Sequence, residues 1–156
     1  MSERSFDQAV ERYEGVVIAS HANPRFASEL STPERGLNDD QIRKLAERGG
    51  VIGVIPYNIF LRTGWRPIEG KQAVSVKRVA ETMDYICQLT GSSRNVGIGS
   101  DFDGGFGAES IPHPMDSIAD LHMIGEALAE LKYEPDQVTQ MLSGNWLAAM
   151  QRGLPH

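Results

Sequence analysis

The sequence is poor in cysteine, in clustered basic residues and in long apolar runs, and each shortage narrows the possible classes of protein. A single cysteine, Cys87, excludes an internal disulfide and a cysteine-based zinc site within one chain. The net charge is −6, without a block of lysine or arginine, which argues against nucleic acid or an anionic membrane as a partner. No apolar run approaches the roughly 20 residues that cross a bilayer. We therefore expect no nucleic-acid partner and no membrane segment.

Length and composition indicate an ordinary globular domain. The 156 residues are enough for one core, so we expect one domain over residues 1–156. The first residues are polar and include an acidic side chain, which is not typical of a signal peptide. A cytoplasmic location is therefore the default expectation.

Apolar runs alternate with amphipathic segments along the chain. Continuous apolar runs at 16–20, 51–55 and 96–100 predict three strands buried on both faces. Helices are expected to begin near Ser5, Asn38, Val76, Ile118 and Pro135. The resulting order, αβαβαβαα, predicts parallel strands joined by right-handed crossovers.

Two of these helices carry detailed expectations. Ser5 and Gln8 fit a capping box at the start of the first helix, and the run 38–41 caps the second. The last helix is expected to bury one apolar face made by Val138, Met141, Leu142, Leu147 and Met150.

The connections between these elements are unequal in length. Turns from helix into strand are short, whereas those from strand into helix exceed a dozen residues. Long loops at the carboxyl ends of the strands are typical of (β/α) barrel enzymes, which have eight strands and about 250 residues. The sequence therefore predicts an α/β fold that is part of a TIM barrel, with about three parallel strands.

Acidic residues follow the third predicted strand. Asp101 ends that strand, and we interpret it as functional because chemistry in α/β folds sits at this end of the strands. For Asp103, a solvated residue at the start of a loop remains the default interpretation. The Asp-x-Asp-Gly string is not a calcium loop, because Phe106 and Pro112 stand where that loop needs glycine and glutamate.

Three further side chains have both a functional and a structural interpretation. His21 follows the first strand and could bind a metal or act as a base, or simply contact the backbone. Arg35 could hold a substrate carboxylate in a two-pronged pair, or be solvated. Tyr57 ends the second strand and could belong to the core or to the wall of a site.

Five segments occur in the order found in the C-terminal part of the membrane (renal-type) dipeptidase family, peptidase family M19. They are Val17–Asn23, Arg35–Asp39, Gly50–Val54, Val96–Gly104 and Gly144–Leu147. The chain resembles this family over essentially its whole length, and the Ser-His and Gly-Ser-Asp-Phe-Asp-Gly strings are the most specific parts of the match.

The resemblance implies a (β/α)₈ hydrolase with two zinc ions that cleaves dipeptides with a metal-bridging hydroxide. By position, His21 matches a metal-ligating histidine after the sixth strand. Asp101 matches the aspartate that carries a proton from the nucleophile to the leaving amine. Arg35 matches the arginine that holds the substrate's C-terminal carboxylate, and Tyr57 matches a substrate-lining tyrosine.

The sequence departs from the family in lacking the other metal ligands. These are a His-x-Asp pair after the first strand, a bridging glutamate and a histidine after the fifth strand. The first three residues resemble the segment that follows this histidine, so the chain is expected to begin just after a ligand. One imidazole cannot hold two zinc ions, so we expect a fragment that is inactive by itself. Unpaired strand edges near 16–20 and 96–100 favour aggregation, oligomerisation or a partner that supplies the missing barrel half.

Two other hypotheses stay open. The chain could be a subunit of a split enzyme, completed by another polypeptide. Alternatively, it could be a non-catalytic module that binds a carboxylate or peptide through Arg35 and the glycine-rich loop after Asp101.

Overall fold

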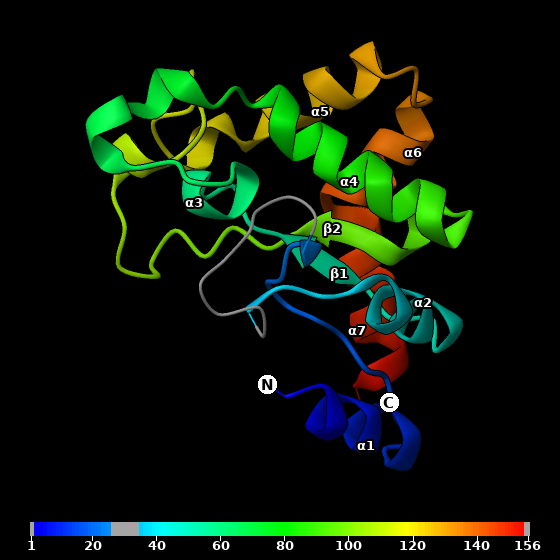
Figure 1. Ribbon diagram of the computed structural model, residues 1–156. Helices are drawn as coiled ribbons and strands as arrows, with labels where there is room; N and C mark the ends of the chain where they lie inside the picture. The colour runs from blue at the N-terminus through cyan, green and yellow to red at the C-terminus, as the bar shows by residue number, and fades with distance from the viewer. Residues whose placement is uncertain (1, 26–34, 155–156) are drawn as a thin grey trace.

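The computed structural model describes residues 2–25 and 35–154, in which helices pack around a short parallel sheet (Figure 1). Strands β1 (Ile52–Val54) and β2 (Val96–Ile98) pair in parallel, with Gly53 opposite Gly97. Parallel pairing at these two places confirms the prediction. Each strand is three residues long and is therefore shorter than the apolar run that predicted it.

The predicted strand over 16–20 is an extended segment that pairs with β1 at one position. The N–H of Ala19 donates to the carbonyl of Val51 at 2.9 Å, and the N–H of Gly53 donates to the carbonyl of Ala19 at 2.8 Å. The segment therefore lies beside β1, on the side away from β2. The expectation that it is buried on both faces is wrong, because Ile18 is 46% exposed.

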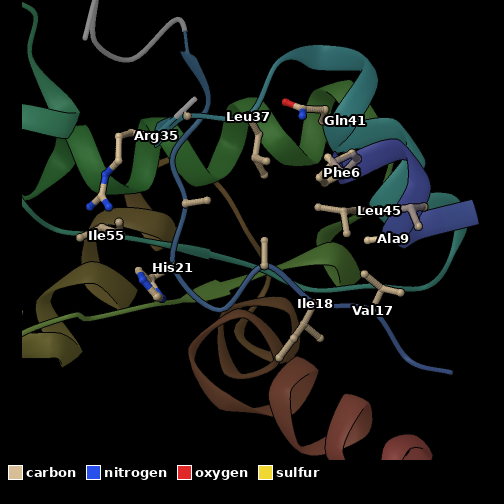
Figure 2. Close-up of a pocket in the computed structure, with 14 residues that line it drawn as sticks. Phe6, Ala9, Val17, Ile18, His21, Arg35, Leu37, Gln41, Leu45 and Ile55 are labelled. Atoms are coloured by element: carbon tan, nitrogen blue, oxygen red, sulfur yellow. The ribbon is translucent and has the colours of Figure 1, made fainter. Parts of the chain in front are cut away.

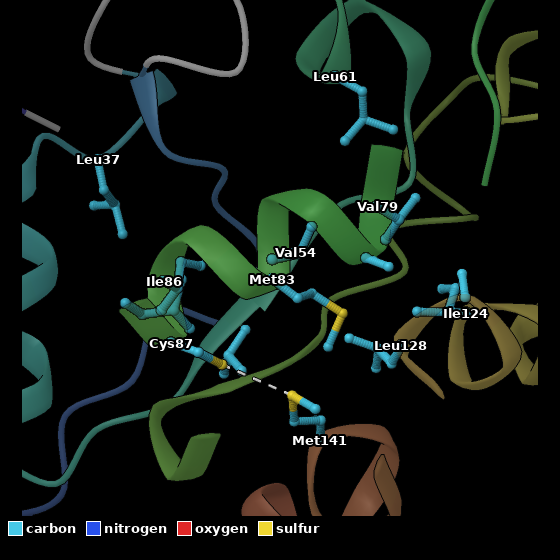
Figure 3. Close-up of a cluster of buried hydrophobic side chains, with 14 of the residues drawn as sticks. Leu37, Val54, Leu61, Val79, Met83, Ile86, Cys87, Ile124, Leu128 and Met141 are labelled. Carbon is cyan, nitrogen blue, oxygen red and sulfur yellow. Dashed lines mark hydrogen bonds between the residues drawn. The ribbon is translucent and has the colours of Figure 1, made fainter. Parts of the chain in front are cut away.

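Helices α2 (Asp39–Glu47) and α4 (Lys77–Thr90) pack on each other, and α4 also packs on both strands. Figure 3 shows Met83 and Ile86 of α4 among the buried side chains, with Leu128 of α5 (His122–Glu130) beside Met83. Cys87 is buried in the same cluster, with its Sγ 3.9 Å from the Sδ of Met141. The core therefore occupies the space between the sheet and this helical layer.

The two predicted helix caps differ in outcome. At α2, Asn38 and Gln41 form the expected capping box, with each side chain accepting from the backbone N–H of the other. Helix α1 (Glu3–Arg12) begins earlier than expected, because Ser2 is its N-cap and accepts from the N–H of Ser5 at 3.2 Å.

The remaining elements are short. They comprise α3 (Asn58–Leu61), α6 (Pro135–Thr139), α7 (Asn145–Gly153), and the 3₁₀ turns Pro67–Glu69, Lys71–Ala73, Ser93–Asn95, Ala108–Ser110 and Ile118–Leu121. The helix expected from Ile118 thus starts with a 3₁₀ turn. No helix in the described part of the chain is long and apolar enough to cross a membrane.

A π-helical turn, Gln140–Gly144, separates α6 from α7. A π turn holds one more residue than an α turn, so the buried face shifts along the sequence after it. Met141 and Ala149 are buried, whereas Leu147 and Met150 are 58% and 56% exposed. The predicted apolar face of the last helix is therefore wrong at Leu147 and Met150.

The start of α7 covers the outer edge of β2. The side-chain amide of Asn145 donates to the carbonyl of Val96 at 2.7 Å, and the indole of Trp146 donates to the carbonyl of Ile98 at 3.0 Å. A Cβ at Gly97 would lie 2.4 Å from the indole nitrogen, so this close approach requires glycine. The expectation of an unpaired edge at 96–100 is therefore wrong for these two carbonyls.

Candidate functional site

The side chains singled out in the sequence lie at one end of the sheet. His21 follows the 16–20 segment, Tyr57 follows β1 and Asp101 follows β2. Because the three segments run parallel, their carboxyl ends share one edge, where α/β folds place their chemistry. Figure 2 shows Arg35 on the same side as His21, at one end of an apolar cavity whose other end is formed by α1 and α2.

His21 is exposed, and its Nδ1 lies 2.8 Å from the Oγ of Ser20. The Nδ1 side of the ring is therefore in contact with the hydroxyl of the preceding residue. His21 and Arg35 both line the cavity of about 250 Å³ that runs beside Val17 and Ile18. The imidazole is therefore accessible from the same side as the guanidinium.

Asn23 holds the His21 loop against β1. It is 4% exposed, its Oδ1 accepts from the N–H of Ile55 at 2.7 Å, and its Nδ2 donates to the carbonyls of Ile55 and Phe60. Sequence reasoning treated Asn23 only as part of a chain-breaking pair. The sequence feature that could have identified Asn23 is an amide side chain two residues after a histidine that ends a predicted strand.

Asp101 has an unusual backbone conformation. Its φ is +52°, in the left-handed region, which costs a residue other than glycine about 1 kcal/mol. Its carbonyl accepts from the N–H of Gly104 at 2.8 Å, and a Cβ at Gly104 would lie 2.8 Å from the Cγ of Asp101. The half-buried carboxylate is therefore folded over a glycine in a tight turn.

Tyr57 belongs to an aromatic cluster. Its ring stacks on Phe106 with centroids 4.2 Å apart and planes within 1°, and it meets Phe60 edge-on at 5.1 Å. The guanidinium carbon of Arg35 lies 5.4 Å from the centroid of Phe60, a cation–π contact. Phe60 thus connects Tyr57 with Arg35, and Phe106 covers the ring of Tyr57. Sequence reasoning named neither phenylalanine as part of the site.

The described residues do not compose a complete metal site. Within 2–25 and 35–154, no group of three histidine, cysteine, aspartate or glutamate side chains is arranged to hold a metal ion. A structural or catalytic zinc ion takes three or four protein ligands. In the part of the chain that the structure describes, His21 is therefore at most one ligand of such a site.

A parallel sheet whose polar side chains and longest loops gather at the carboxyl ends of its segments defines an α/β protein, and this arrangement is typical of enzymes. Comparison with family models identifies the family. The model of the membrane dipeptidases (peptidase family M19) matches residues 1–153, and the chain belongs to this family.

Two curated proteins illustrate the relationship. An uncharacterized protein of the pqqA 5′ region in Klebsiella pneumoniae is 28% identical over 151 residues, which are 97% of this chain and 52% of that protein. An uncharacterized dipeptidase of Schizosaccharomyces pombe is 33% identical over 104 residues, which are 67% of this chain and 23% of that protein. The chain thus spans about half the length of the first relative and less of the second.

Solved structures share the fold. Dipeptidase AC, a metallopeptidase of family M19, superposes with a TM-score of 0.81 at 25% identity, over 98% of this chain and 42% of that one. The probable dipeptidase PvdM of Pseudomonas aeruginosa gives 0.81 at 19% identity, over 97% and 48%. A Rhodobacter sphaeroides metallopeptidase bound to a phosphinate mimic of L-Ala-D-Ala gives 0.77 at 24% identity, over 99% and 41%.

Proposed function

We propose that the chain supplies the substrate-anchoring and proton-transfer part of a metallodipeptidase and is inactive by itself. The observation that carries this proposal is that Asp101, Tyr57 and His21 each follow a segment of one parallel sheet, at its carboxyl edge, in a member of family M19. The absence of a complete ligand set among the described residues supports the second half of the proposal.

Each side chain has a role that its surroundings support. Arg35 binds the C-terminal carboxylate of a dipeptide, and its contact with Phe60 restricts the guanidinium before substrate arrives. Asp101 carries a proton to the leaving amine, Tyr57 lines the substrate, and His21 offers one imidazole to zinc. Because the zinc site is incomplete in the described residues, we assign no hydrolytic step to this chain alone.

We further propose that the sheet is part of a (β/α)₈ barrel completed by another polypeptide segment. Two observations support this arrangement. The 16–20 segment lies next to β1 at the edge of the sheet, and an apolar cavity lies beside Val17 and Ile18. A further strand next to 16–20 would cover both this edge and the cavity. The segment could belong to a partner chain of a split enzyme or to a longer form of this chain.

A non-catalytic role is the second candidate. Arg35 contacts the ring of Phe60, which is not a metal ligand, so the chain could bind a carboxylate or peptide as a module. Zinc-independent binding of a dipeptide by the purified chain, lost in Arg35→Ala and without turnover in any assembly, would favour this role.

The test is hydrolysis of a panel of dipeptides with zinc, with a chelator as control. We expect no turnover by the chain alone, and turnover after co-expression with a polypeptide that carries the remaining strands and ligands. Asp101→Asn should abolish this turnover, whereas Glu109→Gln in the same loop should preserve it. Chelator-sensitive turnover by the chain alone would contradict its proposed inactivity, and a reconstituted assembly without turnover would contradict the proposed chemistry.

A further inference from the structure

A second cavity, of about 460 Å³, lies in the loop after β2. Its apolar walls are made by Phe102, Phe106, Ala108, Ile111 and Ile118. Ser100 and Phe102, the two neighbours of Asp101 in the sequence, both line it. The cavity therefore lies beside the chain on both sides of Asp101, the residue to which we assign proton transfer.

Two carboxylates line this cavity, and they differ in their partners. Asp116 is paired with Lys71, whose Nζ lies 2.6 Å from its Oδ1. Asp103 is exposed and has no hydrogen bond or ion pair with any residue that the structure describes. The cavity thus combines apolar walls with one carboxylate whose charge no described neighbour balances.

The walls are held in place before any ligand binds. Phe106 stacks on Tyr57 and meets Phe102 edge-on at 6.4 Å, so its ring is held from two sides. Ile111 is 3% exposed, and its carbonyl accepts from the buried amide of Asn58 at 3.2 Å. A preformed wall lowers the entropy lost when a ligand binds.

We propose that this cavity binds an ammonium group attached to an apolar or aromatic side chain, as in the amino-terminal residue of a peptide. Asp103 pairs with the ammonium group, and the side chain packs against Phe102 and Ile111. That this ligand is part of a substrate rests on the proposed function. The cavity then gives the enzyme a preference for dipeptides whose first residue is large and apolar over dipeptides that begin with glycine.

Binding can be measured by calorimetry on the purified chain without metal, using phenylalaninamide as the probe. This probe has the ammonium group and the aromatic ring but no carboxylate, so it does not depend on Arg35. N-acetylphenylalaninamide, which lacks the charge, should bind about fivefold more weakly. Glycinamide, which lacks the ring, should bind about tenfold more weakly.

Variants assign the two contacts. Asp103→Asn should weaken phenylalaninamide about fivefold. Glu109→Gln should leave it unchanged, because that carboxylate is turned onto the N–H of Gly107 and the hydroxyl of Ser110. Ile118 is 65% exposed, so Ile118→Ser should not unfold the chain and should weaken phenylalaninamide but not glycinamide.

The outcomes separate this inference from the proposed function. No detectable binding of phenylalaninamide, equal binding of its acetylated form, or unchanged binding by Asp103→Asn would overturn the inference. Binding with the expected pattern in a chain that never supports hydrolysis would uphold the cavity and contradict the dipeptidase proposal. Hydrolysis with equal kcat/KM for dipeptides that begin with glycine and phenylalanine would do the reverse.

Discussion

Asn23 and Ile55 form a reciprocal pair of hydrogen bonds in which a side-chain amide takes the place of a neighbouring strand. The N–H of Ile55 donates to the Oδ1 of Asn23 at 2.7 Å, and the Nδ2 of Asn23 donates to the carbonyl of Ile55 at 3.1 Å. The pair continues the hydrogen bonding of the sheet one step beyond β1. Because His21 lies two residues before Asn23, the hydrogen bonds between Asn23 and Ile55 also hold the backbone near His21 against the end of β1.

Asn23→Ala should destabilise the fold. It leaves the buried N–H and carbonyl of Ile55 without this partner, and each such loss costs about 1–3 kcal/mol. We expect the free energy of unfolding in urea to fall by roughly 2–4 kcal/mol. The exposed Gln72→Ala should change it by less than about 0.5 kcal/mol. Equal stability of the two variants would contradict the anchoring role.

Gly97→Ala should also destabilise, for a steric reason. The added methyl group would meet the indole of Trp146 at a distance that no side chain tolerates, and overpacking of this kind costs about 1–3 kcal/mol. In a double-mutant cycle with Trp146→Ala, the cost of Gly97→Ala should largely disappear. Strictly additive effects on the urea midpoint would show that the two residues do not interact.

Cys87 should be chemically inert in the folded chain. Burial raises the pKa of its thiol to about 11, so on the order of one thousandth of it is thiolate at pH 8. Alkylation by iodoacetamide should be slow in the native protein and fast in urea. Equal rates in the two states would contradict the buried position of the thiol.

The carboxylate of Asp120 should make the stability of the folded chain depend on pH. Backbone N–H groups of Asp116 and Ser117 donate to its carboxylate, which lowers its pKa below the ordinary value. The stabilisation is therefore present above the ordinary pKa of about 4 and is lost as the pH falls through the lower pKa of the folded state. The Tm of the wild-type chain should exceed that of Asp120→Asn near pH 6, and the difference should shrink toward pH 2. A difference that stays constant with pH would contradict this account.

Local patterns predicted the elements whose causes are local. The apolar runs located β1 and β2, and the Asn38–Gln41 capping box located the start of α2, because both depend on residues close together in the sequence. An uninterrupted helical period predicts Leu147 and Met150 on the buried face. The π turn before α7 shifts that face, and both side chains are exposed. Nothing in the apolar spacing announced that turn.

The candidate site shows the same division. Strand ends identified Asp101 and His21, but the residues that position them act across long stretches of chain. Asn23 bonds to Ile55 across 32 residues, and Trp146 bonds to Ile98 across 48. The ring of Phe106 stacks on that of Tyr57, which lies in a different loop. Such contacts leave no periodic trace in a sequence.

The capped edge of β2 has a consequence for assembly. With Asn145 and Trp146 occupying its outward carbonyls, the sheet has one blocked side and one receptive side, at 16–20. A strand edge whose carbonyls already accept hydrogen bonds is a poorer template for a new neighbour than one whose carbonyls do not. We therefore expect a further strand to add at 16–20 first, and a strand that closes a barrel at β2 would have to displace the side chains of Asn145 and Trp146.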